Sequence, residues 1–61
     1  YSRAWYNVGM SHYNHGRIED ALTAWRAALC GNPNFQPALT ELQRVLRAHP
    51  ELRTPTDPPA D

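Results

Sequence analysis

The side chains in this 61-residue chain that could bind a transition metal are three histidines and one cysteine. His12 and His15 are three positions apart, so on a helix they share a face and could hold one metal ion, with Cys30 or His49 as more distant ligands. No carboxylate lies close to this pair in the sequence, and His12 falls at a position that a helix uses for packing. We therefore interpret the pair as structural and predict no metal and no cofactor.

Residues that could catalyse a reaction do not form a recognisable set. Glu19 and Asp20 are adjacent, so on a helix their carboxylates point in different directions. No serine or cysteine has an evident base with an orienting group. Cys30 could be a reactive thiol or form an intermolecular disulfide, but free cysteines commonly behave as small hydrophobic residues, and we interpret it as half-buried. The sequence predicts that this is not an enzyme.

Charge and composition exclude several kinds of partner. Six basic residues balance six acidic ones, so the chain lacks the electrostatic signature of a nucleic-acid-binding protein. No run approaches the roughly 20 apolar residues of a membrane-spanning helix, and no signal peptide precedes the first helical pattern. All six basic residues are arginine, which together with six prolines hints at a bacterial source. We expect a piece of a longer soluble protein, with a cytoplasmic location favoured over others.

Three stretches carry the apolar period of an amphipathic helix, at residues 3–15, 18–30 and 35–48. Gly16 suits the left-handed conformation that ends the first stretch, and Gly31-Asn32-Pro33 ends the second. Asn34 is the expected N-cap of the third stretch, with Pro37 in its first turn. From residue 50 the chain is rich in proline and poor in large apolar residues, which predicts a flexible tail.

The first two predicted helices resemble a tetratricopeptide repeat, a 34-residue helical hairpin. The resemblance rests on large and small residues in register over the whole repeat, namely Trp5, Val8, Gly9, His12, Gly16, Ala21, Trp25, Ala28 and Pro33. The fold class is therefore expected to be all-α, with the repeat at residues 2–35, a capping helix at 36–49 and the tail at 50–61. Ala38, Leu39 and Leu42 repeat the pattern of Ala4, Trp5 and Val8, while Gln43 stands where Gly9 stands earlier.

The resemblance implies a close hairpin. Gly9, Ala21 and Ala28 are expected to let the two helices approach, with Trp5, Leu22 and Trp25 filling the volume between them. A third helix with a polar outer face, formed by Gln43, Arg44 and Arg47, suits the end of a repeat array.

The family also implies a function, which is to bind a protein or peptide on the concave face lined by the first helix of each repeat. The positions carried over to this chain are Arg3, Tyr6, Met10, Tyr13 and Asn14, continued by Pro37, Thr40 and Arg44. Tyr6 and Met10 stand where some members carry the groups that clamp a terminal carboxylate, so we do not expect that specificity. The alternative is self-assembly, because one hairpin with one cap leaves apolar surface open to an adjacent repeat or to a second copy in a homo-oligomer.

Overall fold

A computed structural model describes residues 1–55 and 57 of the chain. These residues form three α-helices, α1 (Ser2–Asn14), α2 (Ile18–Gly31) and α3 (Gln36–Ala48), followed by a single 3₁₀ turn, η1 (Pro50–Leu52). The observed helix ends lie within one residue of those predicted from the apolar period. The all-α fold, a helical hairpin with an additional helix, is confirmed.

The helix ends are set by the connecting turns and not by capping side chains. Gly16 has a φ of +76°, the left-handed conformation expected where the first helix ends. None of the three helices has a side-chain hydrogen bond at its N-cap. The prediction that Asn34 caps α3 was wrong: Phe35 is the N-cap, while the N–H of Asn34 donates to Oδ1 of Asn32 at 3.2 Å.

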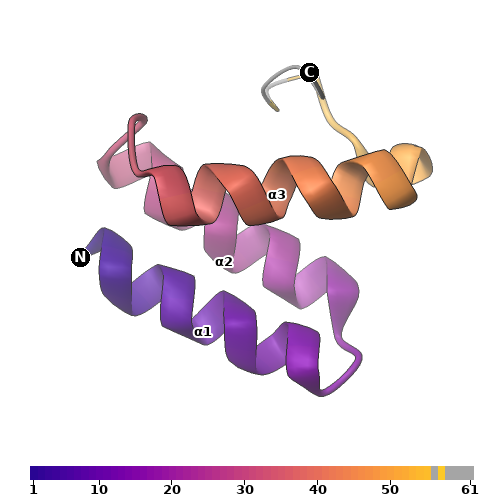
Figure 1. The fold of residues 1–61 in the computed structure, drawn as a ribbon, viewed down its shortest axis with the longest axis horizontal. Coiled ribbons are helices and arrows are strands. Elements are labelled where there is room, and N and C mark those ends of the chain that lie inside the picture. The colour runs from indigo at the N-terminus through magenta and orange to yellow at the C-terminus, as the bar shows by residue number, and fades with distance from the viewer. Residues whose placement is uncertain (56, 58–61) are drawn as a thin grey trace.

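The middle helix, α2, lies behind α1 and α3 in Figure 1 and packs against both. It runs antiparallel to α1, as the hydrogen bond from Oγ of Ser2 to the carbonyl of Ala28 (2.8 Å) requires. The buried core is built from one face of α2 and one face of α3. Its members are Ala21, Leu22, Ala24, Trp25, Ala28, Ala38, Leu42, Val45 and Leu46.

Within the hairpin, the small residue Gly9 of α1 packs against the large side chain of Trp25 in α2. Gly9 is buried, and a Cβ atom built on it would lie only 2.5 Å from Cδ1 of Trp25. Ala21 and Ala28 are fully buried as well, so these small residues do lie at the close approach that the sequence predicts.

Trp5 does not fill the interior of the hairpin, which corrects the prediction. Its side chain is 47% exposed, because Trp25 already occupies the space beneath Gly9 and no described helix covers this flank of α1. Leu22 and Trp25, by contrast, are buried as expected.

The chain after α3 also differs from the extended tail that its composition suggests. Pro50–Leu52 form η1, Leu52 packs against the core, and Asp57 is buried. Residue 56 and residues 58–61, which complete the predicted tail, lie outside the described residues. Among the described helices, none is both long and apolar enough to cross a membrane.

Candidate interaction surfaces

Three residues of α1, Tyr6, Met10 and Tyr13, form an apolar stripe that we call the inner stripe. Tyr6 and Met10 are half-buried and pack against the core. The ring of Tyr6 meets Phe35 edge-on, with centroids 6.1 Å apart. The ring of Tyr13 is tilted over Trp25 at 5.9 Å and remains 39% exposed. The stripe is therefore a partly open aromatic surface whose rings are fixed by core residues.

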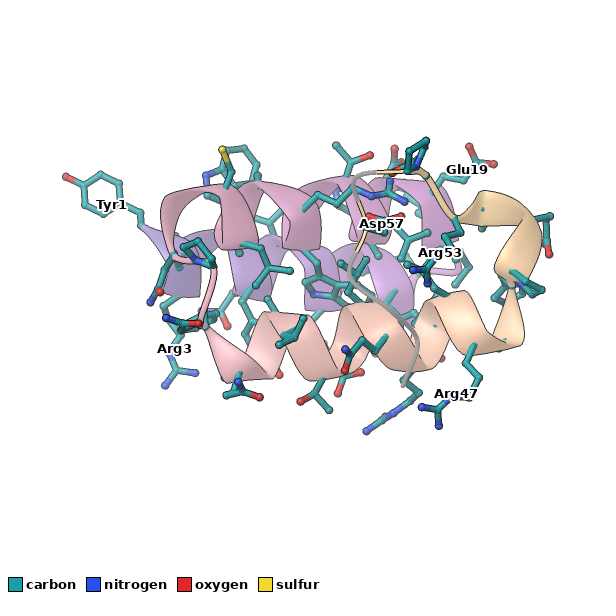
Figure 2. All side chains as sticks on the ribbon, turned by 90° about the horizontal axis from the view of Figure 1, so that it is seen from above. Tyr1, Arg3, Glu19, Arg47, Arg53 and Asp57 are labelled. Carbon is teal, nitrogen blue, oxygen red and sulfur yellow. The ribbon has the colours of Figure 1, made fainter. Side chains whose placement is uncertain are left out.

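Polar residues predicted to bind a partner flank this stripe. Arg3 and Asn14 are exposed near the two ends of α1, and Arg3 projects beyond the helices in Figure 2. Pro37 and Thr40 are exposed on α3. Arg44 is also exposed, but its guanidinium lies 3.4 Å from the carboxylate of Glu41 in an i,i+3 pair, which lowers its value as a free cation for a ligand.

The opposite flank of α1 carries a second apolar surface, the outer edge, formed by Ala4, Trp5 and Val8. Trp5 and Val8 are 47% and 42% exposed, and Ala4 is exposed as well. The residues 34 positions later in the sequence behave differently: Ala38 and Leu42, which correspond to Ala4 and Val8, are fully buried against α2. Positions that correspond in the 34-residue repeat are therefore buried in α3 and exposed to solvent in α1.

The residues considered for metal binding are not brought together. Within residues 1–55 and 57, no three side chains of His, Cys, Asp or Glu lie close enough to hold a metal ion. His15 Nδ1 donates to the carbonyl of Ser11 at 2.7 Å, and His49 lies 3.6 Å from the carboxylate of Glu51. Cys30 is exposed and not half-buried, because it lies on the solvent side of the last turn of α2.

One ion pair with several hydrogen bonds was missed by sequence reasoning. Arg26 of α2 donates from Nε and from a terminal nitrogen to the two carboxylate oxygens of Asp57, each at 2.8 Å. These hydrogen bonds hold the pKa of Asp57 below its ordinary value and raise that of Arg26. No periodicity links two residues 31 positions apart, so only the fold reveals the pair.

Comparison with known proteins identifies the hairpin. A family model described as tetratricopeptide repeat matches residues 2–29. A UPF0164 protein of Treponema pallidum (strain Nichols) is 38% identical over 42 residues, which are 69% of this chain but only 10% of the length of that relative. No solved structure matches the chain.

The match and the fold agree on the same segment. The repeat signature places Gly9, Ala21, Trp25 and Ala28 inside the α1–α2 hairpin, Gly16 in its turn and Pro33 after its end, while His12 is half-buried on α1. Repeats of this family are non-enzymatic modules that generally mediate protein–protein interaction. Over residues 2–29, this chain is a tetratricopeptide repeat.

Proposed function

We propose that this chain is a protein-interaction module that binds a peptide or protein segment across the inner stripe of α1. The observation that carries the proposal is the fixed position of two partly open aromatic rings, Tyr6 against Phe35 and Tyr13 against Trp25. Rings that are already held by the core lose little side-chain entropy when a ligand covers them. Met10 lies between them, and its flexible thioether adapts to different apolar groups.

The polar residues beside the stripe would orient the bound segment. Arg3 and Asn14 are exposed at opposite ends of α1 and can supply hydrogen-bond donors at two separated points. Arg44 on α3 extends the same surface, although Glu41 competes for its guanidinium. This division into an apolar centre and a polar rim is that of an ordinary binding interface.

A test needs a defined probe, because no ligand is known. Peptides selected from a random display library would be titrated into isotope-labelled protein while the backbone and methyl spectra are followed. We expect the largest shifts at Tyr6, Met10 and Tyr13. The double variant Arg3→Ala, Asn14→Ala should weaken binding about tenfold, since hydrogen bonds to charged groups contribute on that scale.

Ser11→Ala serves as the matched control, because Ser11 is exposed on α1 but lies away from the stripe. It should leave the affinity unchanged and should not lower the stability of the fold. The proposal would be contradicted by peptides that shift the Trp5 indole signal and bind the Arg3→Ala, Asn14→Ala variant with unchanged affinity. Such a result would place binding at the outer edge.

A second candidate function, assembly, is favoured by the exposure of Trp5 and Val8. We propose that the outer edge packs against a further helical hairpin, from an adjacent repeat or from a second copy of the chain. The support is the 34-residue correspondence, since Ala38 and Leu42 are fully buried where Ala4 and Val8 are open.

The size of the outer edge limits how firmly two copies can pair. A standard interface needs about 800 Å² from each partner, whereas the whole chain exposes 4044 Å². The three apolar side chains of the outer edge cannot provide a fifth of that surface. A stable homodimer would therefore have to use the length of α1, including polar positions such as Ser11 and His12.

A further inference from the structure

The residues that follow α3 return to α2 and are bonded to it. We call residues 50–55 and 57 the strap. One terminal nitrogen of Arg26 donates to the carbonyl of Leu52 at 3.1 Å, and the same guanidinium forms the two 2.8 Å hydrogen bonds to Asp57. The N–H of Thr54 donates to the Asp57 carboxylate at 2.8 Å. The Asp57 side chain is 1% exposed, so the strap is held by a buried carboxylate.

The repeat register explains why the strap lies there. Leu52 follows Ile18, the first residue of α2, by 34 positions, and both side chains are half-buried against the core. Leu52 of the strap therefore stands where the second helix of a further hairpin would begin. Pro55 and Pro58 stand where α2 has Ala21 and Ala24. Proline inside a helix removes a backbone hydrogen bond and clashes with the preceding turn, so a helix is strongly disfavoured at Pro55.

The space that such a helix would occupy is only partly covered. A hollow of about 460 Å³ lies between α2 and α3, and we call it the α2–α3 groove. Its lining is mainly apolar and comprises Arg26, Leu29, Cys30, Pro33, Leu39, Leu42 and Asp57. Asp57 is thus part of the lining of the groove, and it is labelled in Figure 2.

From these relations we infer that the strap is a latched closing element. It takes the place of the next helix and covers this side of the helical stack, and the Arg26–Asp57 pair is its latch. The latch works as a unit, because a buried carboxylate that loses its arginine is strongly unfavourable. The strap is therefore either bonded to α2 or released from it, and release removes Asp57 from the lining of the α2–α3 groove. The inference does not depend on ligand binding at the inner stripe.

Amide hydrogen exchange measured residue by residue tests the latch in the full 61-residue chain. In the unsubstituted protein, the amides of Thr54 and Asp57 should exchange more slowly than in a short peptide of the same sequence. Arg26→Gln and Asp57→Asn should each raise the exchange rates at positions 54 and 57 by about tenfold or more, since hydrogen bonds to a charged group are lost. Amides in the hairpin core, such as that of Trp25, should keep their rates.

Two further variants make the result specific. Arg44→Gln is the matched control, because it also removes an arginine from an arginine–carboxylate pair, but from the exposed pair with Glu41; it should leave positions 54 and 57 unchanged. Arg26→Lys keeps the positive charge but loses the planar guanidinium that donates two parallel hydrogen bonds. The exchange rates at positions 54 and 57 should therefore rise less than they do in Arg26→Gln.

Three results would overturn the inference. The first is peptide-like exchange at positions 54 and 57 in the unsubstituted chain. The second is protection that survives Asp57→Asn. The third is loss of protection throughout the core in the Arg26 variants, which would make the pair a general support of the fold and not a local latch.

Discussion

The indole ring of Trp25 lies directly against the backbone of Gly9, so that the smallest residue type in α1 faces the largest in α2. A Cβ at position 9 would be 2.5 Å from Cδ1 and 2.9 Å from Cε2 of the ring, and the ring is fully buried. The indole N–H has no hydrogen-bond partner among the described residues, so it is packed for shape and not for polarity. The contact between Gly9 and Trp25 therefore limits how closely α1 and α2 can approach at this point.

The Gly9→Ala variant should be less stable than the parent chain, although alanine favours a helix. Helix propensity contributes about 1 kcal/mol in favour of alanine, while overpacking a rigid core costs about 1–3 kcal/mol. The new methyl group meets a ring that has no free space, so overpacking should prevail. Urea denaturation followed by circular dichroism measures the difference. Gly31→Ala is the control, because its Cβ would meet only Oγ of Ser2 at 3.5 Å.

The Trp25→Phe substitution should relieve most of that penalty. Phenylalanine removes the part of the indole that crowds Gly9, together with its unpartnered N–H. In a double-mutant cycle, the cost of Gly9→Ala should shrink by about 0.5 kcal/mol or more when residue 25 is phenylalanine, as residues in direct contact couple on this scale. If the free-energy changes of the two substitutions were strictly additive, the contact between Gly9 and Trp25 would not limit how closely α1 and α2 pack.

The Ser2→Ala variant should lose a modest amount of stability. The Ser2 hydroxyl donates to the carbonyl of Ala28 at 2.8 Å and ties the start of α1 to the end of α2. That carbonyl also accepts from the N–H of Asn32 at 3.1 Å, so it is not left unpaired. We expect a loss of about 0.5–1 kcal/mol, at the lower end of the range for a hydrogen bond. Thermal denaturation should detect it, whereas Ser11→Ala, at an exposed position inside α1, should lose no stability, because alanine favours a helix more than serine does.

The outer edge can be tested with Trp5→Ser. Because Trp5 is 47% exposed, its loss should lower the stability of a monomer only slightly. If the edge packs on a second copy, the variant should dissociate in sedimentation velocity at micromolar concentration while the parent chain associates. A parent chain that is folded and monomeric at that concentration would exclude self-association and leave an adjacent repeat as the partner for this edge.

Acid should weaken the chain through Asp57. Its pKa in the folded chain is lowered below the ordinary value of 3.8, first of all by the hydrogen bonds from Arg26. A lowered pKa stabilises the folded state above pH 3.8, and this contribution is lost as the pH falls towards the folded pKa. The melting temperature should therefore drop more steeply between about pH 5 and pH 2 in the parent chain than in Asp57→Asn. Parallel curves would show that the pair does not contribute to stability.

Helical period and terminators were enough to predict the elements. Gly16 and Gly31-Asn32-Pro33 mark breaks that follow from backbone preference alone, and all helix ends were placed to within one residue. The packing partners of Gly9, Ala21 and Ala28 were also predictable, because small residues at helical spacing imply close approach.

The orientation of large residues within a helix was harder to predict. Trp5 and Tyr6 are neighbours with similar apolar character, and the sequence does not say which of them faces α2 and which remains open. That depends on where Trp25 and Phe35 place their rings, which is a tertiary property. The strap was missed for a related reason, since its order comes from one ion pair between distant residues and not from local composition.

The strap also makes the two sides of the helical stack different from each other. One side of the described stack presents apolar side chains at Trp5 and Val8, while the other side is crossed by its own chain and pinned at Arg26. Head-to-tail filaments need two different complementary faces, and here one of the two is occupied. Two copies that met through α1 would instead bury both apolar edges and leave a strap at each far end. If two copies paired in this way, the assembly would stop at a dimer, because the strap occupies the far side of each copy.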